Sequence, residues 1–532
     1  MANVMNDIKR EIGNTSYSVT ENGAVGYSTT MNPILDANFG VSSARNLSDD
    51  EVQKVFAEAY HFDKVTAMKW LAYVRDVRGG MGERRYFRLA MTYIADTEPS
   101  VAIAMLPLVA EYGRWDDVVY IYAHTKSKSV SKAYTSLISN QLKKDGKCYN
   151  EGIGMSLLAK WLPSVNASSK ETVSTAVRLA KALYSNVSDY VAIKKYQRLL
   201  VKLRKALNIV EVYASAKRWS EIDYAKVPSG ANLKFFKAFM RHDPERRQAY
   251  LDALKKGETK INASVLFPHD IVHKYDSTYR VDDAIEALWK EISSKFVDIA
   301  NTIVVCDGSG SMSWTNVGNT KIDALEVAHA ISIYFSEHLT GEYKDKYITF
   351  SSSPRFVDLE KCHTLFDKLK IARSHSDCSN TDIEKVFMLI LNVAIKNNYK
   401  QSDIPANVLV ISDMEFDRGC CRSDETLFES IRRKYKEAGY ELPRLVFWNV
   451  CSRTNTIPIT SNKLGVALVS GFSTATVSMV MSEQTDPYKA LLDTINVERY
   501  APVEKAVTNA LNGKSTTNAH NNYNKNNARR KH

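Results

Sequence analysis

The chain has 532 residues, a length that predicts about two to four domains rather than one. Hydrophobic residues make up 44% and charged residues 25%, and this balance excludes a mostly disordered chain. The sequence contains no apolar run of about 18 residues, and its N-terminus lacks the apolar stretch of a signal peptide. We therefore expect an intracellular, cytoplasmic protein without a membrane partner.

Cysteine usage and charge add two further expectations. The seven cysteines include no CxxC pair, which favours reduced thiols over a zinc cluster. The net charge of +11 is unevenly spread, because residues 1–290 carry about +10 and the remainder about +1. A basic first half predicts a polyanionic partner such as RNA.

The first half of the chain has a helical pattern. Residues 1–45 are rich in Asn, Ser, Thr and Gly, and we predict a loosely ordered N-terminal arm there. Over residues 46–295 apolar side chains recur at helical spacing, as in the series Val52, Val55, Phe56, Ala59 and Tyr60. Strand-like alternation is nearly absent. This region is therefore predicted to be an α-helical domain, either a bundle or an irregular repeat of helix pairs.

The pattern changes after residue 295. Short apolar runs rich in β-branched residues, at 301–306, 347–350, 408–411, 445–450 and 466–469, alternate with helical stretches at 321–338, 382–395, 424–438 and 487–495. This alternation predicts an α/β domain over residues 296–511 with a mostly parallel, Rossmann-like sheet. Residues 512–532 are rich in Asn and basic residues, and we predict a disordered tail.

Oxygen-bearing side chains gather in three loops of the α/β region. Asp307, Ser309 and Ser311 follow the first predicted strand, Thr381 precedes a helix, and Asp413 follows the strand at 408–411. The carboxyl ends of parallel strands meet at one edge of a sheet, so these residues are expected to converge. Carboxylate and hydroxyl oxygens without imidazole or thiolate suit a hard cation such as Mg²⁺, with Mn²⁺ or Ca²⁺ as alternatives.

This set resembles the metal-ion-dependent adhesion site (MIDAS) of von Willebrand factor A domains, in which Asp-x-Ser-x-Ser is followed by a Thr and then an Asp. The resemblance implies that Asp307, Ser309, Ser311, Thr381 and Asp413 bind the metal. It also implies that an acidic side chain or a phosphate of a partner completes the coordination. The alternative is a helix cap and turn that bind no ion.

Motifs in the helical half of the chain resemble an uncharacterised family, domain of unknown function 2828. They lie at 73–88, 106–118, 159–166, 203–211, 218–231 and 267–272. That family joins a helical region to a C-terminal von Willebrand A domain, and both parts are similar to the TROVE module and A domain of Ro ribonucleoproteins. In Ro proteins HEAT-like helical repeats form a ring that binds small non-coding RNAs. The resemblance implies an RNA-binding helical domain here.

Basic residues of the helical region are the candidate RNA contacts. The segment RGGMGERR at 78–85 could surround a phosphate with glycine N–H groups and arginine side chains, or it could be a helix–helix connection with paired arginines. Later basic residues could line an RNA surface or form an ordinary solvated face. The predicted contacts are Arg75, Arg78, Arg84, Arg85, Lys194, Lys195, Arg198, Lys234, Lys237 and Arg241.

Two catalytic alternatives are weaker. The segment 269–273 imitates a zinc-protease motif, but Asp270 replaces its glutamate and no third ligand is apparent. Asp413, Glu415 and Asp417 could serve a metal-dependent nuclease. We therefore predict a non-catalytic RNA-binding protein with a divalent-cation site. A metal-dependent protein-interaction or assembly module is the alternative, and a nuclease is the least favoured reading.

Overall fold

The chain forms two compact units, and the segments of each are not contiguous in sequence. The computed structural model describes residues 17–513 apart from 208, 264, 279, 295–298, 300, 319, 377, 420–425, 455, 459–465 and 472–485. Residues up to 48 together with 222–494 make one unit, here called the α/β unit. Residues 49–221 together with the segment from 495 onward make the other, here called the helical unit.

This division differs from the predicted domain bounds of 46–295 and 296–511. The helices α13 (Ser229–His242), α14 (Pro244–Lys256), α15 (Pro268–Val272) and α16 (Asp283–Ser293) belong to the α/β unit. Helix α24 (Ala501–Leu511) belongs to the helical unit instead, where it packs on two helices near the start of that unit. Helical periodicity marks each of these segments as a helix but does not say which core buries its apolar face.

The N-terminal segment is ordered from residue 17, where a loose arm was predicted. Strands β1 (Tyr17–Val19) and β2 (Val25–Tyr27) form an antiparallel hairpin, followed by α2 (Pro33–Phe39) and a short 3-10 helix, η1 (Ser43–Arg45). Tyr27 and Ile457 exchange backbone hydrogen bonds of 2.8 and 2.7 Å, so partners far along the chain order this segment. Residues 1–16, and the predicted tail from 514 onward, lie outside the described residues.

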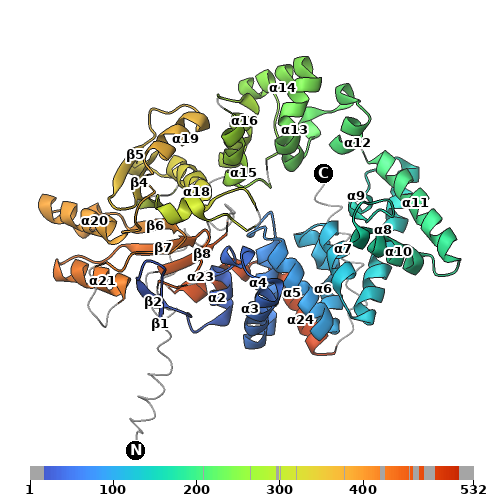
Figure 1. The fold of residues 1–532 in the computed structure, drawn as a ribbon, viewed down its shortest axis with the longest axis horizontal. Helices are drawn as coiled ribbons and strands as arrows, with labels where there is room; N and C mark the ends of the chain where they lie inside the picture. Colours follow the sequence, from blue (N-terminus) through green and yellow to red (C-terminus); the bar gives the residue numbers. More distant parts are fainter. Residues whose placement is uncertain are drawn as a thin grey trace, which may run out of the picture. The chain divides into compact units, whose positions relative to one another are not determined.

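In the helical unit, successive helices of the chain lie next to one another, some antiparallel and some crossing (Figure 1). Ser127 and Ser169 cap two of them by accepting hydrogen bonds from backbone N–H groups of the first turn, as expected for N-cap serines. The helices are α3 (Asp49–Phe62), α4 (Lys64–Arg75), α5 (Arg85–Thr97), α6 (Pro99–Tyr112), α7 (Trp115–His124), α8 (Lys128–Glu151), α9 (Leu158–Trp161), α10 (Lys170–Leu183), α11 (Asp189–Ala206) and α12 (Val210–Ser215).

A buried carboxylate ties the C-terminal segment into the helical unit. Asp76 follows α4 and is fully buried. It accepts hydrogen bonds from the guanidinium of Arg499, one of them 2.8 Å long, and from the Tyr500 hydroxyl at 3.1 Å. Its backbone carbonyl accepts from the N–H groups of Gly80 and Gly82. The glycine-rich loop after α4 is therefore a structural connection.

The α/β unit contains a six-stranded sheet in the order β5-β4-β3-β6-β7-β8. All neighbouring strands are parallel except β5, an antiparallel edge strand. The five strands predicted from apolar runs are confirmed, and the polar β5 was not predicted. The strands are β3 (Thr302–Asp307), β4 (Lys346–Phe350), β5 (Arg355–Asp358), β6 (Asn407–Ser412), β7 (Arg444–Asn449) and β8 (Val466–Ser470).

Helices cover both faces of this sheet. Successive side chains of a strand point to opposite faces of the sheet, so Phe447 and Trp448 of β7 lie on different faces. Trp448 meets Phe335 of α18, and Phe447 meets Phe428 of α21, in edge-on ring contacts 5.4 and 4.7 Å apart. The helices of this part are α17 (Gly310–Trp314), α18 (Ala324–His338), α19 (Leu365–Ser374), α20 (Glu384–Asn397), α21 (Leu427–Glu437) and α23 (Pro487–Ile495). None of the described helices has the length and hydropathy needed to cross a bilayer.

The Asp76 contacts predict a large effect of mutation. Asp76→Ala leaves the Arg499 guanidinium without its carboxylate, and should lower the free energy of unfolding of the helical unit by about 3 kcal/mol. Urea titration followed by circular dichroism measures this loss in the free energy of unfolding. The matched control is Glu437→Ala, which removes the exposed partner of the half-buried Arg433 and should cost less than about 0.5 kcal/mol. Equal losses in the two variants would contradict this role of Asp76.

Candidate metal centre

Three of the predicted ligands lie where β3 passes into α17: Asp307 ends the strand, Ser309 is the N-cap of the helix, and Ser311 is in its first turn. The backbone N–H of Ser309 donates to Oδ1 of Asp307 at 2.9 Å, and the hydroxyls of Ser309 and Ser311 are 3.0 Å apart. Asp307 and Ser309 are buried, and Ser311 is partly exposed. Gly308 lies against β4 and Gly310 against a neighbouring loop, where a side chain would come within 2.8 Å of Thr349 Oγ1 and of the Cys378 carbonyl oxygen, respectively. The glycines thus allow this segment to lie close against both neighbours.

Asp413 lies at the end of the neighbouring strand. Strands β3 and β6 pair with Cys306 opposite Ile411, which brings the residues after them side by side. The Ser412 hydroxyl donates to Oδ2 of Asp307 at 2.5 Å. Asp413 is 0% exposed, and its Oδ2 atom has no hydrogen-bond partner among the described residues. A buried carboxylate oxygen without a donor is what a bound cation would satisfy.

The electrostatics of the two carboxylates agree with a cation site. Burial raises the pKa of both the Asp307 and the Asp413 carboxyl groups, and the charge of Asp307 raises the pKa of Asp413 further. Hydrogen bonds from Ser412 and Ser311, respectively, act in the opposite direction. Two buried carboxylates at adjacent strand ends repel each other, and a divalent cation between them would remove that repulsion. The donor set of two carboxylates and hydroxyls fits Mg²⁺ or Mn²⁺.

Thr381, the remaining predicted ligand, is held beside the loop that follows Asp413. It is buried, and it exchanges hydrogen bonds with Asp417, which donates its N–H to the Thr381 carbonyl at 2.9 Å. The Thr381 N–H donates in turn to the Asp417 carboxylate at 3.2 Å. The neighbouring Asp382 accepts from the N–H of Lys385, so it caps the first turn of the next helix. Hydrogen bonds thus link Asp307, Ser309 and Ser311, strand pairing places Asp413 next to them, and Asp417 holds Thr381 on the loop after Asp413.

Three residues at this site were not found from the sequence. Asn22 donates its side-chain N–H to Oγ1 of Thr381 at 3.2 Å, and Arg453 places Nη2 3.7 Å from Oδ2 of Asp413. The same guanidinium pairs with Glu21 at 2.9 Å. Glu21 and Asn22 come from the β1–β2 turn and Arg453 from the loop after β7. Separations of hundreds of residues and the absence of a motif leave no sequence signal for them.

Glu415 and Asp417, considered above for a nuclease, have structural partners. Glu415 is fully buried, and its carboxylate accepts hydrogen bonds from the N–H groups of Glu21, Arg453 and Thr454 at 2.9–3.0 Å. It therefore holds the β1–β2 turn and the loop after β7 together. Because these hydrogen bonds occupy the Glu415 carboxylate, it is not free to bind a second metal ion.

The predicted RNA contacts before residue 90 divide into buried and exposed groups. Arg75 was predicted as a surface contact, but it is 3% exposed and pairs with Asp117 at 2.8 Å, so it cannot contact RNA in this structure. Residues 67–75 of α4 are all buried, so helical periodicity gave no sign that Arg75 is inside the unit. Arg78 and Arg84 are exposed, whereas Arg85 is half-buried and pairs with Asp49. The N–H groups of Gly80 and Gly82 are bonded to a backbone oxygen, so the predicted phosphate-binding loop cannot offer them to a phosphate.

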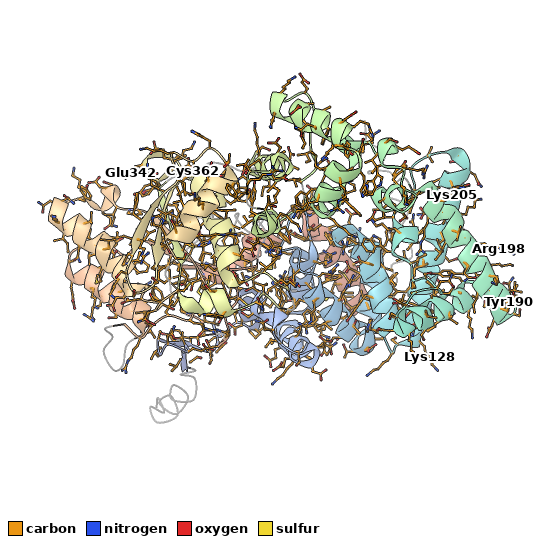
Figure 2. All side chains as sticks on the ribbon, turned by 45° about the horizontal axis from the view of Figure 1, so that its top comes forward. Lys128, Tyr190, Arg198, Lys205, Glu342 and Cys362 are labelled. Carbon is orange, nitrogen blue, oxygen red and sulfur yellow. The ribbon has the colours of Figure 1, made fainter. Side chains whose placement is uncertain are left out.

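The later predicted contacts all lie on exposed helix faces. Lys194, Lys195 and Arg198 are on α11 of the helical unit, where Figure 2 shows Tyr190, Arg198 and Lys205 following one another along the helix. The other three are on α13 of the α/β unit. They are Lys234, Lys237 and Arg241.

The imitation of a zinc-protease motif does not form one. His269 is buried and stacks on Phe267, away from the group that His273 joins. His273 lies 3.0 Å from Glu326 and 3.3 Å from Asp276, and the ligand atoms of these three residues lie within 4.8 Å of one another. The two acidic neighbours of His273 were not foreseen from the sequence. Arg373 also pairs with Asp276, at 2.5 Å, so a cation is already present at this cluster.

The fold and the site define a class of protein: a helical unit joined to an α/β unit with a mostly parallel sheet and buried carboxylates and hydroxyls at its strand ends. Residues 20–135 and 116–305 match the model of the family described as "Domain of unknown function (DUF2828)", and the chain belongs to this family. Residues 301–520 match a second model, "Domain of unknown function (DUF7788)".

Two individual proteins resemble the chain over most of its length. "Uncharacterized protein L728" of Acanthamoeba polyphaga mimivirus is 29% identical over 525 residues, which cover 91% of this chain and 88% of that protein. The crystal structure of the Deinococcus radiodurans RO (RSR) protein aligns with 87% of this chain and 94% of its own. Its sequence identity is 15% and its TM-score 0.44, a likeness too weak to carry an inference about function.

The unsatisfied carboxylate predicts opposite effects on stability and metal binding. Asp413→Asn should raise the stability of the metal-free protein by about 1–3 kcal/mol, because it removes a buried charge next to Asp307. The same variant should lose the rise in melting temperature that Mn²⁺ gives the wild type. Differential scanning calorimetry with and without Mn²⁺ measures both, with Asp382→Asn as the control. A variant that Mn²⁺ still stabilises would contradict Asp413 as a ligand.

Proposed function

We propose that this chain is a non-catalytic RNA-binding protein, whose helical unit binds RNA and whose α/β unit carries a divalent-cation site of the MIDAS type. The observation that carries the proposal is a basic and aromatic stripe on α11. Tyr190, Lys194, Arg198 and Lys202 recur every four residues and therefore share one face of the helix. The buried residues Ala192, Tyr196, Leu200 and Leu203 occupy the opposite face.

The charges of this stripe are not neutralised nearby. Lys194, Arg198 and Lys202 form no ion pair with any residue that the structure describes, although ion pairs occupy many other basic residues of the unit. Tyr190 is 71% exposed, and the Lys194 ammonium lies 5.7 Å from its ring centre. Basic side chains interleaved with an exposed ring can bind phosphates and stack a base, which is the pattern of single-stranded RNA surfaces.

The distribution of charge between the units supports the same assignment. Residues 49–221 and 495–513 carry a net charge of about +9, whereas the α/β unit carries about −3. The positive charge thus belongs to the helical unit rather than to the first half of the chain. The basic residues on α13 belong to the slightly acidic α/β unit, so we place RNA on α11.

The proposed cation site is supported by its donor set and by the unsatisfied Asp413 oxygen. Asp307 and Asp413 would supply two negative charges, and Ser309, Ser311 and Thr381 would supply hydroxyls. A bound cation would fix the loops after β3 and β6 relative to each other. Because the Glu415 carboxylate is already bonded to three backbone N–H groups, it is not free to hold a second metal for hydrolysis, which favours binding over catalysis.

Removing the stripe's charge should weaken RNA binding in a salt-dependent way. The triple variant Lys194→Gln, Arg198→Gln and Lys202→Gln should bind labelled single-stranded RNA of about 20 nucleotides at least about tenfold more weakly at low salt. The slope of log affinity against log salt should fall by about 2. Fluorescence anisotropy measures both quantities. The control removes three exposed lysines of the α/β unit, Lys361, Lys370 and Lys396, and equal losses in both triple variants would refute this surface.

Stacking on Tyr190 predicts a difference between two substitutions. Tyr190→Ala should weaken binding of single-stranded RNA by about 1–3 kcal/mol, whereas Tyr190→Phe, which keeps the ring, should change it little. Anisotropy at fixed salt compares the variants on single-stranded and fully paired RNA. Paired RNA should be insensitive to Tyr190→Ala, since its bases are already stacked. An equal loss on both RNAs would exclude base stacking by this ring.

A further inference from the structure

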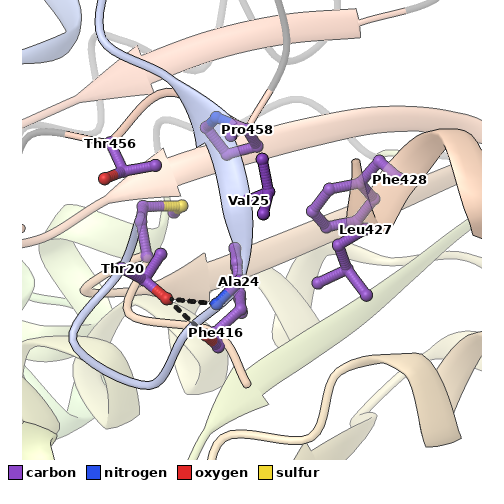
Figure 3. Close-up of a pocket in the computed structure, with 10 residues that line it drawn as sticks. Thr20, Ala24, Val25, Phe416, Leu427, Phe428, Thr456 and Pro458 are labelled. Atoms are coloured by element: carbon purple, nitrogen blue, oxygen red, sulfur yellow. Dashed lines mark hydrogen bonds between the residues drawn. The ribbon is translucent and has the colours of Figure 1, made fainter. Parts of the chain in front are cut away.

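The turn between β1 and β2 lies on the loop that follows Asp413. Three successive turn residues bind that loop: Thr20 Oγ1 donates to the Phe416 carbonyl at 2.6 Å, the Glu21 N–H to Oε2 of Glu415 at 3.0 Å, and the Asn22 side chain to the Glu415 carbonyl at 2.7 Å. Apolar contacts lie beneath the hairpin, where Ala24 and Val25 face Phe416, Leu427 and Phe428 (Figure 3). The hairpin is thus a fixed part of the site's surroundings.

The site is closed where the hairpin covers it. Asp307, Ser309, Thr381 and Asp413 are each no more than 1% exposed. Asn22, itself exposed, binds Thr381 from the outer side. A carboxylate from another molecule therefore does not reach these ligands in this arrangement. The carboxylate of the chain's own Glu21 is separated from Asp413 by one guanidinium.

That guanidinium belongs to Arg453, which stands between two carboxylates. Its Nη2 atom lies 2.9 Å from Glu21 Oε2 and 3.7 Å from Asp413 Oδ2. The first distance is a charge-assisted hydrogen bond, and the second is too long for one. The backbone N–H of Arg453 donates to buried Glu415 at 2.9 Å, so the residue is anchored here. Among the residues that the structure describes, Arg453 is the one whose cationic group pairs with the unsatisfied Asp413 oxygen.

We propose that Arg453 is the resident cation of the proposed metal centre: without a metal ion, its guanidinium partly compensates the charge of Asp413. When a divalent ion binds Asp413, the carboxylate of Glu21 holds the Arg453 guanidinium instead. The inference rests on the proposed cation site. With the ion bound, two cations would share Asp413, and their repulsion favours the Arg453–Glu21 pair. Arg453 therefore lowers the affinity for the metal, Glu21 raises it, and metal binding fastens the hairpin.

Mn²⁺ titration by isothermal calorimetry tests these opposite signs. Arg453→Gln should tighten Mn²⁺ binding about tenfold, because it removes a positive charge beside Asp413. Arg453→Lys should stay close to wild type, and Glu21→Gln should weaken binding about threefold or more, because it removes the charge that neutralises Arg453. Arg433→Gln, which removes an equal charge from a half-buried arginine on α21, should not change Mn²⁺ binding. Circular dichroism confirms that each variant is folded.

A second readout follows the hairpin itself. Added Mn²⁺ should slow hydrogen exchange at residues 20–27 in the wild type, and this protection should be lost in Glu21→Gln. Mn²⁺ binding by the wild type with an unchanged affinity in Arg453→Gln would overturn the role of Arg453 and leave the metal centre standing. Binding in neither the wild type nor Arg453→Gln would refute the metal centre itself. Binding in Arg453→Gln alone would support the inference, since the resident cation would then be sufficient to exclude the metal.

Discussion

Two carboxylates, Asp307 and Asp413, end neighbouring parallel strands at a place that water does not reach. Burial of two like charges at adjacent positions is unfavourable unless a cation or several donors compensate them. Much of the surrounding structure serves this requirement: serine hydroxyls contact Asp307, the loop after β6 turns back through buried Glu415, and an arginine lies near the one oxygen left without a donor. Exchange between that arginine and a metal ion would connect the site to the N-terminal hairpin.

The path of the chain explains why both of its terminal segments matter. The segment from residue 17 to 48 belongs to the α/β unit, and the segment from 495 belongs to the helical unit, where Asp76 binds Arg499 and Tyr500. Each unit therefore needs sequence from both sides of the other. The units also differ in charge, because the positive excess is in the helical unit and the hairpin and metal ligands are in the slightly acidic one. The two proposed activities, RNA binding and cation binding, thus belong to different units.

Sequence reasoning succeeded where local pattern determines structure. Apolar β-branched runs predicted the five parallel strands. The rule that the carboxyl ends of parallel strands meet at one edge of a sheet then predicted that Asp307 and Asp413 lie together, and β3 and β6 are indeed neighbours. It failed where distant contacts decide. Both Arg75 and Arg198 were predicted to contact RNA from their charge, but Arg75 is buried and binds Asp117, whereas Arg198 is exposed. A loose arm was predicted where the short strands β1 and β2 form, because the residues that hold this segment in place are more than 350 positions away in the sequence. Arg453 has no motif, so only the structure brings it to Asp413.

The central claim is that Asp307 and Asp413 form one cation-binding centre. Anomalous diffraction from crystals of the full chain grown with Mn²⁺ tests it most directly, because the anomalous signal locates the metal without reference to the protein's hydrogen bonds. The account predicts one strong peak within coordination distance of oxygens from both residues, about 2.0–2.3 Å away. A peak only at His273, Asp276 and Glu326, or none beside Asp413, would contradict it.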